Sequence, residues 1–124
     1  MNSLNSKIDD EYRDSFLGKS LALYIHIPFC EHVCHYCDFA KTANYGDEQV
    51  KKYFSFLEAS FDAWHKFLGK PKFHSVFVGG GTPSLFSVEY KPLFQKMTPY
   101  LTSDAEVTIE ANPKHVSPLS LIHI

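Results

Sequence analysis

The sequence lacks both a block of like charge and an apolar run long enough to cross a membrane. Twelve Lys and Arg residues against fourteen Asp and Glu residues leave a formal net charge of −2. Neither sign forms a block that could neutralise a phosphate backbone, so we expect no nucleic-acid partner. The longest apolar stretch, residues 21–29, is broken by His26 and falls short of the roughly 18 residues that suggest a membrane span. These absences favour a cytoplasmic protein.

The amino-terminal segment lacks the features of a targeting sequence. Residues 1–19 are polar and include Asp9, Asp10, Glu11 and Asp14. They have neither the apolar core of a secretory signal nor the acid-poor composition of a transit peptide. We therefore expect residues 1–19 to be a solvated leader that can be disordered.

Cysteine is scarce, and the cysteines that occur are close together. Cys30, Cys34 and Cys37 lie within eight residues and are the three cysteines of the chain. An odd, clustered set cannot pair completely into disulfides. In a reducing compartment, clustered thiols are more often a metal site or a reactive site than a set of crosslinks.

What the sequence does contain is an alternation of strand and helix patterns. Strands are predicted at residues 20–27, 73–78 and 106–110, and helices at residues 47–68 and from about residue 87 to residue 100. Helices of this length can return the chain across a sheet in right-handed βαβ units. The sequence therefore predicts an α/β fold with parallel strands, as the start of a (β/α) barrel or as a doubly wound sheet.

The first predicted helix has one apolar face and recognisable ends. Asp47 is the expected cap at its start, and Gly69 and Pro71 are expected to end it. Pro92 falls in or near the first turn of the second predicted helix, where a missing N–H costs least. The apolar residues that share the face of the first helix are Val50, Tyr53, Phe54, Leu57, Phe61, Trp64 and Leu68.

The cysteine loop directly follows the first predicted strand. Its cysteines are separated by three and then two residues, which lets the loop wrap a small inorganic cluster, and iron–sulfur clusters take thiolate ligands. Three thiolates for four irons leave one iron open to an exogenous ligand. The alternatives are unrelated structural cysteines and a Cys3His zinc site that uses His32 or His35.

Two further groups are expected at the same edge of the sheet. Gly79, Gly80 and Gly81 follow the second predicted strand, and Glu110 closes the third. The carboxyl ends of parallel strands meet at one edge, where α/β folds place their reactive groups. Alone, these features also fit a flexible turn and a solvated carboxylate. Together with the cysteine loop, they describe a pocket for a cluster and a small zwitterionic ligand.

These segments resemble the motifs of one family. Residues 24–39, the Gly-Gly-Gly-Thr-Pro stretch at 79–83 and the Glu-Ala-Asn-Pro stretch at 110–113 resemble the radical S-adenosylmethionine (SAM) branch that contains oxygen-independent coproporphyrinogen III oxidase and the HemW-type heme chaperones. The resemblance covers about residues 21–118 and implies the N-terminal part of a radical SAM partial (β/α) barrel. The matching residues of the first segment are Tyr24, His26, Ile27, Pro28, Phe29, Cys30, Cys34, Tyr36, Cys37, Asp38 and Phe39.

The resemblance implies the cofactors and partners. Cys30, Cys34 and Cys37 would ligate a [4Fe-4S] cluster, and SAM would chelate the open iron through its amino and carboxylate groups. One electron would cleave the sulfonium to methionine and a 5′-deoxyadenosyl radical, chemistry that belongs to the cofactor. The implied partners are SAM, heme or a porphyrinogen, an electron donor and a membrane-associated heme acceptor.

The resemblance also implies the residues that contact SAM. The two tyrosines would contact SAM, the glycine-loop residues would bind its methionine end, and the carboxylate would meet its amino group or ribose. For His26, a second interpretation is an inward strand residue satisfied by backbone. The implied SAM contacts are Tyr24, Tyr36, Gly80, Gly81, Thr82 and Glu110.

Within the branch, the residues after the third cysteine favour the HemW type. The coproporphyrinogen oxidases place a fourth cysteine two residues after the third, where this sequence has Phe39. The resemblance therefore implies heme binding and transfer in porphyrin metabolism. Oxidative decarboxylation of coproporphyrinogen III to protoporphyrinogen IX is the alternative, and a zinc-stabilised binding module is a distant third.

The expected organisation has three parts. Residues 1–19 are the leader, residues 20–118 the N-terminal portion of a radical SAM core domain, and residues 119–124 an atypical tail. The tail is apolar where an amphipathic helix is expected, which indicates truncation. Three parallel strands would also leave a long sheet edge exposed, so we expect the isolated chain to be poorly soluble and inactive.

Overall fold

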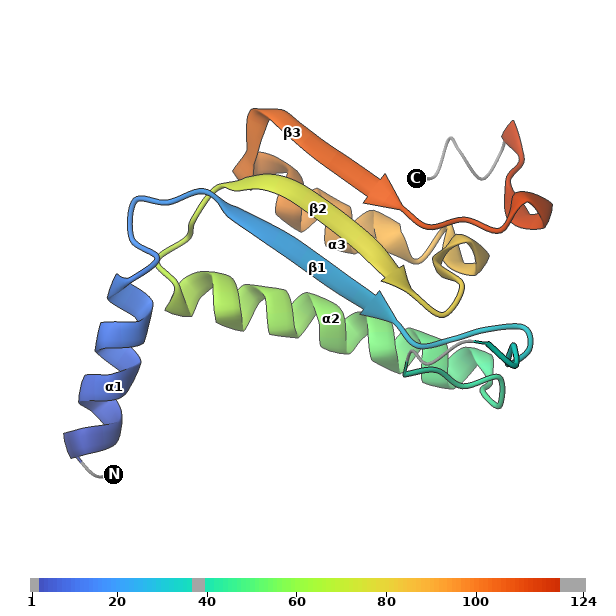
Figure 1. The fold of residues 1–124 in the computed structure, drawn as a ribbon, viewed down its shortest axis with the longest axis horizontal. Helices are drawn as coiled ribbons and strands as arrows, with labels where there is room; N and C mark the ends of the chain where they lie inside the picture. Colours follow the sequence, from blue (N-terminus) through green and yellow to red (C-terminus); the bar gives the residue numbers. More distant parts are fainter. Residues whose placement is uncertain (1–2, 37–39, 119–124) are drawn as a thin grey trace.

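Three parallel strands form the centre of the fold (Figure 1). The structure is a computed structural model that describes residues 3–36 and 40–118. Its sheet contains β1 (Leu21–Ile27), β2 (Phe73–Gly80) and β3 (Leu101–Ile109) in the order β1-β2-β3. Both strand pairs are parallel. The predicted α/β class with parallel strands is therefore confirmed.

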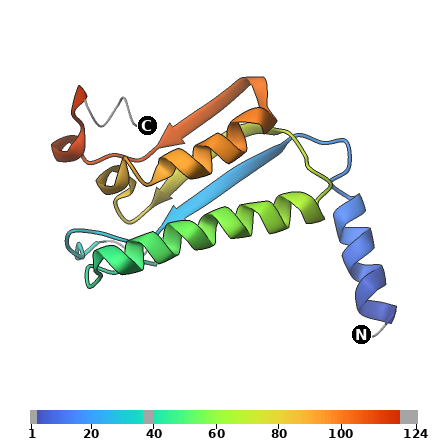
Figure 2. The ribbon, with the colours of Figure 1, turned by 180° about the vertical axis from the view of Figure 1, so that it is seen from behind.

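Two helices cover one face of this sheet. α2 (Asp47–Phe67) and α3 (Tyr90–Met97) lie behind the strands in Figure 1 and in front of them in the reverse view of Figure 2. The helix predicted from about residue 87 to residue 100 is shorter in the structure: α3 begins at Tyr90, after a 3₁₀ turn at Pro83–Phe86 (η1), and a second 3₁₀ turn at Thr98–Tyr100 (η2) replaces its last residues. Pro92 lies in the first turn of α3, as predicted. Within the described part of the chain, the opposite face of the sheet carries no helix.

The core lies between the sheet and these two helices. Ile25 and Ile27 of β1 and Val76 and Val78 of β2 are buried, because alternate residues of a strand point to the same face. Aromatic side chains of the helices and loops complete this core. The cluster comprises Ile25, Ile27, Phe29, Val50, Phe54, Phe61, Phe73, Val76, Val78, Phe86, Tyr90, Leu93 and Met97.

The amino end of α2 differs from its prediction. Its N-cap is Gly46 rather than Asp47, and the N–H of Gly46 donates to Oε1 of Gln49 at 2.7 Å. Asp47 instead lies in the first turn, where a carboxylate is favoured by the positive end of the helix dipole. The other end agrees with prediction, since the helix ends at Phe67, two residues before Gly69, whose φ is 80°.

The buried face of α2 also differs from its prediction. Trp64 is 57% exposed, whereas His65 is 6% exposed. The His65 ring stacks on Phe61 with centroids 5.0 Å apart, and its Nε2 lies 3.0 Å from the carbonyl oxygen of Pro71. This hydrogen bond offsets the cost of burying an imidazole, so a polar residue takes the place predicted for tryptophan.

The amino-terminal segment contains a helix that the sequence did not predict. α1 (Ser3–Asp14) projects from the amino end of β1, away from the cysteine loop (Figure 1). Its Arg13 side chain pairs with Asp10 at 2.9 Å and with Asp14 at 3.0 Å, and the i,i+3 pair supports an exposed helix. The described side chains of α1 are mostly exposed to solvent.

β3 begins earlier than its prediction. It starts at Leu101 rather than Glu106, and its pairing with β2 is irregular. Leu101 pairs with Phe73 and Glu106 pairs with Ser75. Between these two pairs the chain advances five residues in β3 but only two in β2. The extra polar residues hide the period-two pattern of a strand.

Tyr90 links α3 to the glycine loop. Its side chain is fully buried, and its hydroxyl donates to the carbonyl oxygen of Pro83 at 2.8 Å. Burial, with a smaller effect of the Glu89 charge, raises the pKa of this phenol well above its usual value. Since the pKa is higher in the folded state, the associated stability is complete below about pH 10 and is lost as the pH rises above it.

The Tyr90→Phe variant is therefore expected to show two changes. At neutral pH it should lose about 1 kcal/mol of unfolding free energy, the contribution of one hydrogen bond. Above about pH 10 its stability should fall less steeply than that of the unaltered chain. Denaturant unfolding of dilute protein at neutral and alkaline pH measures both changes. If the two proteins lose the same unfolding free energy between neutral and alkaline pH, Tyr90 does not cause the alkaline loss of stability.

Candidate functional site

The three predicted motifs meet at the carboxyl edge of the sheet. In Figure 1, the loops that follow β1, β2 and β3 lie together at the arrowheads. The N–H of Gly81 donates to the carbonyl oxygen of Ile27 at 2.6 Å, and the N–H of Thr82 donates to that of Phe29 at 2.7 Å. Backbone hydrogen bonds thus hold the glycine loop against the start of the cysteine loop.

The cysteine loop presents two free thiols among the described residues. Cys30 is buried and Cys34 is partly exposed. The N–H of Cys30 donates to the carbonyl oxygen of Thr42 at 3.0 Å, and the N–H of Thr42 donates to that of Pro28 at 2.6 Å. These bonds join the two ends of the loop. Cys37, the third predicted ligand, lies outside the described residues.

The glycine run allows a close approach that side chains would prevent. A Cβ at Gly81 would lie 2.5 Å from the carbonyl oxygen of Phe29 and 2.8 Å from Sγ of Cys30. A Cβ at Gly80, whose φ is 118°, would lie 2.7 Å from the ring of His26. Only glycine fits both positions without a shift of the surrounding atoms.

Glu110 faces the glycine loop from the end of β3. Its Oε2 accepts a hydrogen bond from the N–H of Gly80 at 3.2 Å. Beside this carboxylate is an open pocket of about 350 Å³. Three of the predicted SAM contacts therefore share one pocket, and a fourth borders it through this hydrogen bond. The lining residues are Gly81, Thr82, Pro83, Glu110, Ala111, Asn112 and Pro113.

The two predicted tyrosines lie apart from this pocket. Tyr24 is on the sheet face without helices, where it stacks on Phe77 with ring centroids 6.1 Å apart. Tyr36 is in the cysteine loop and is 88% exposed. Neither residue lines the pocket beside Glu110, so the geometry does not group all the predicted SAM contacts.

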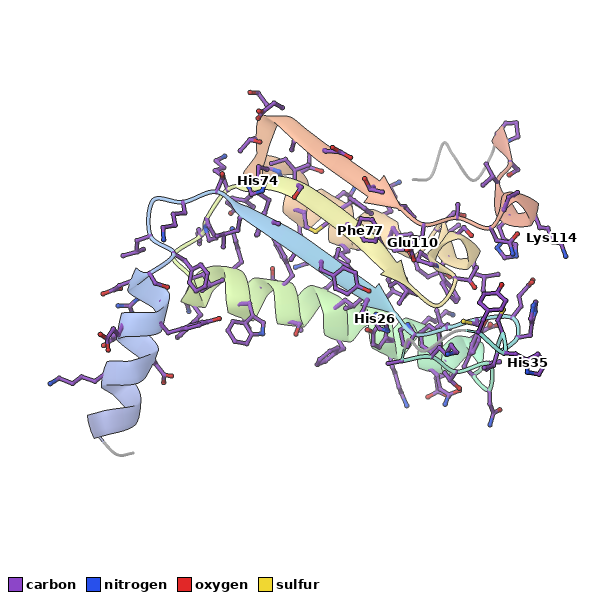
Figure 3. The ribbon with its side chains drawn as sticks, in the orientation of Figure 1. His26, His35, His74, Phe77, Glu110 and Lys114 are labelled. Atoms are coloured by element: carbon purple, nitrogen blue, oxygen red, sulfur yellow. The ribbon has the colours of Figure 1, made fainter. Side chains whose placement is uncertain are left out.

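His26 connects β1 to the segment that follows the third cysteine. Its Nδ1 lies 2.9 Å from the hydroxyl of Tyr24, and its Nε2 lies 2.7 Å from the carbonyl oxygen of Ala40. Figure 3 shows His26, Phe77 and Glu110 on the uncovered face of the sheet. The backbone partner agrees with one part of the second interpretation of His26, satisfaction by backbone, but the ring lies on the uncovered face rather than inward.

One residue of this edge was missed from the sequence. His115, in the 3₁₀ turn Pro113–His115 (η3), has its Nδ1 3.1 Å from Oγ of Ser84 and its Nε2 3.3 Å from Oε1 of Glu31. Oγ of Ser84 also accepts the N–H of Asn112 at 3.0 Å. The only signal was its position just after the Glu-Ala-Asn-Pro stretch, because its partners are distant in the sequence.

The residues present fit a thiolate-ligated cluster. Among residues 3–36 and 40–118, no group of three His, Cys, Asp or Glu side chains is placed to hold a metal ion, and the third cysteine lies outside these ranges. Cys30 and Cys34 nevertheless supply soft donors, and the glycine loop beside Sγ of Cys30 has no side chain. Such a donor set suits iron–sulfur ligation.

Sequence comparison identifies relatives of the chain. No protein-family profile matches it. Curated proteins named heme chaperone HemW are 42% identical over 98 residues in Bacillus subtilis, 40% over 100 residues in Haemophilus influenzae and 38% over 99 residues in Escherichia coli. These matches cover 75 to 76% of this chain and 25 to 26% of the relatives. The chain thus spans about a quarter of the length of the curated relatives it matches.

Structural comparison gives the same grouping. The solved structure of coproporphyrinogen III oxidase (HemN) from Escherichia coli, a radical SAM enzyme, matches with a TM-score of 0.77. The match covers 92% of this chain and 28% of that one, at 23% identity, and so it concerns the fold alone. It favours the partial barrel over the doubly wound sheet. The chain is thus similar in sequence to part of the proteins named heme chaperone HemW and shares the fold of part of a radical SAM enzyme.

Proposed function

We propose that this chain is part of a HemW-type radical SAM protein and holds a [4Fe-4S] cluster through Cys30, Cys34 and Cys37. The observation that carries the proposal is the contact between two loops. The glycine loop lies so close to Cys30 that a Cβ at Gly81 would come within 2.8 Å of its Sγ. A cofactor held by the thiolates would therefore be adjacent to the pocket beside Glu110.

SAM is proposed to bind in that pocket. Its amino group is a hydrogen-bond donor that suits the Glu110 carboxylate, and the bare backbone at Gly80 and Gly81 can approach its methionine end. Thr82 lines the same pocket. When bound, a cluster reduced by an electron donor would supply the electron that cleaves the sulfonium, while the residues of this chain would bind and orient SAM.

The two tyrosines are proposed as further SAM contacts from outside the pocket. Tyr24 would approach from the uncovered face of the sheet, where its hydroxyl is held by His26. Tyr36 would approach from the exposed part of the cysteine loop. Both side chains can offer a hydroxyl and an aromatic surface to a ligand that is part apolar and part charged.

For the whole protein we propose heme binding and transfer in the cytoplasm, with an electron donor and a heme acceptor at a membrane as partners. The name of the curated relatives and the presence of Phe39 in place of a fourth cysteine support this role. Among the described residues, no helix has the length and apolar character needed to cross a membrane. The fold match to HemN keeps oxidative decarboxylation of coproporphyrinogen III as a second candidate.

Anaerobic reconstitution of the chain with iron and sulfide tests the cluster. We expect about four iron and four sulfide ions per chain and a brown colour. A parallel sample without sulfide is the control. Zinc retained without sulfide would instead support a zinc module that uses His32 or His35.

A separate assay distinguishes the two candidate functions. Protein carrying this chain is supplied with heme, or with coproporphyrinogen III, SAM and a reductant. Retained heme without formation of protoporphyrinogen IX supports the chaperone. Formation of protoporphyrinogen IX supports the oxidase.

A further inference from the structure

A single imidazole contacts the cysteine loop and the glycine-loop side of the pocket. The His115 side chain is 12% exposed. Its Nδ1 meets Ser84, which follows the glycine loop, and its Nε2 lies near Glu31, the residue after Cys30. His115 itself is on the segment that follows β3. The side chains of Glu31, Ser84 and His115 therefore form one cluster, to which each of the three motif loops contributes one residue.

The hydrogen bonds of Ser84 favour one tautomer of the His115 ring. Oγ of Ser84 accepts the N–H of Asn112 at 3.0 Å, so its own proton can be donated to Nδ1 of His115. The imidazole then carries its proton on Nε2, which is buried and has no aligned hydrogen-bond partner among the described residues. The Glu31 carboxylate lies 3.3 Å from Nε2, within ion-pair distance but out of line for a hydrogen bond.

A catalytic role of this serine, histidine and glutamate does not fit the geometry. Ser84 is 6% exposed, and its hydroxyl is already engaged by Asn112. A nucleophile has to reach a substrate. The cluster is better suited to hold loops in place.

We propose that His115 is a positioning residue that fixes the cysteine loop, through Glu31, against the pocket of the glycine loop and β3. The inference rests on the proposed function, in which that pocket takes SAM. Glu31 is adjacent to Cys30, and Asn112 lines the pocket. SAM has to reach an iron held by the cysteines while it occupies the pocket. The contact between His115 and Glu31 would therefore influence SAM affinity, because it fixes the position of the cysteine loop relative to the pocket.

Four variants of the chain test this role. His115→Ala removes the contact, His115→Gln keeps a donor and an acceptor, and Glu31→Gln removes the charge from a side chain that is 51% exposed. His74→Ala is the matched control, because His74 is exposed and lies near the amino end of β2 (Figure 3).

Two readouts separate positioning from general stability. In protein without cofactors, hydrogen exchange should become faster at residues 30–36 and at the Asn112 amide in His115→Ala, with an unchanged rate in the core of β2. In reconstituted protein, iron content should stay at the unaltered level while SAM binds about tenfold more weakly, as expected for one lost contact with a charged group. His115→Gln should recover part of that affinity, and His74→Ala should match the unaltered chain.

The outcomes distinguish this proposal from the proposed function. If the unaltered chain binds SAM and His115→Ala binds it equally well with unchanged exchange, the positioning role is wrong. If no cluster or SAM is bound, the proposed function fails, and hydrogen exchange alone decides whether His115 holds the loops. Should His115→Ala fail to fold, Glu31→Gln decides the matter, because a surface substitution leaves the core intact.

Discussion

The Cys34→Ser variant is expected to lose its iron–sulfur cluster. Under the proposed function, serine removes one of three thiolates, and iron should fall from about four to less than one per chain after reconstitution. Cys34 is only partly buried, so the unfolding free energy should change by less than about 0.5 kcal/mol. Metal and sulfide analysis, the visible absorption spectrum and circular dichroism measure these effects.

His35→Gln is the matched control for the cysteine variant. It alters the neighbouring residue in the same exposed part of the loop. The cluster hypothesis predicts full iron in this variant, whereas a Cys3His zinc site that uses His35 predicts loss of metal. A Cys34→Ser protein that still holds a complete cluster would contradict the proposed ligand set.

The Gly81→Ala variant is expected to damage both stability and SAM binding. Its Cβ would overlap the carbonyl oxygen of Phe29 at 2.5 Å and Sγ of Cys30 at 2.8 Å. Neither the carbonyl oxygen of Phe29 nor the sulfur of Cys30 can move without disturbing the loop. We expect a loss of about 3 kcal/mol in unfolding free energy, measured by denaturant unfolding, and SAM binding too weak to detect by calorimetry.

Gly46→Ala is the control for this substitution. A Cβ at Gly46 would meet no atom within 4 Å, and its φ of −118° is accessible to alanine. Because Gly46 is the N-cap of α2, alanine should still cost up to about 1 kcal/mol. Equal losses in the two variants would show that the close approach at Gly81 is not responsible.

The sequence predicted those features of the fold that depend on local patterns. The strand and helix order followed from periodicity, and the carboxyl edge followed from the rule that parallel strands end together. For this reason the sequence could predict that Gly81 lies near the cysteine loop and that Glu110 lies near Gly80. Their distances could not, since these depend on how the loops cross.

Features that depend on contacts between distant residues could not be predicted. The burial of His65 in place of Trp64 requires the carbonyl group of Pro71. The early start of β3 requires pairing of Leu101 with Phe73. Pro71 is close to His65 in the sequence, but the sequence pattern does not show that its carbonyl group turns back toward the helix. Phe73 is distant from Leu101 in the sequence.

For the candidate site, too, the sequence predicted what depends on local patterns and missed what depends on contacts between distant residues. The sequence singled out Glu110 and the glycine run because they stand at the ends of predicted strands. It gave no reason to connect His115 with Glu31, since these residues approach only after three strands have paired. The grouping of Tyr24 and Tyr36 with the pocket stays a prediction, as do the roles of the three cysteines, the glycine loop and Glu110.

The bridge between Phe29 and Thr42 has a consequence for how a cofactor could be inserted. Closing a loop of roughly a dozen flexible residues costs about 2 kcal/mol in chain entropy. In this fold that closure is made by backbone hydrogen bonds, from Cys30 to Thr42 and from Thr42 to Pro28. Under the proposed function, a cluster would bind to a loop whose two ends are already held together, so cluster binding would not have to supply the entropy of closing that loop.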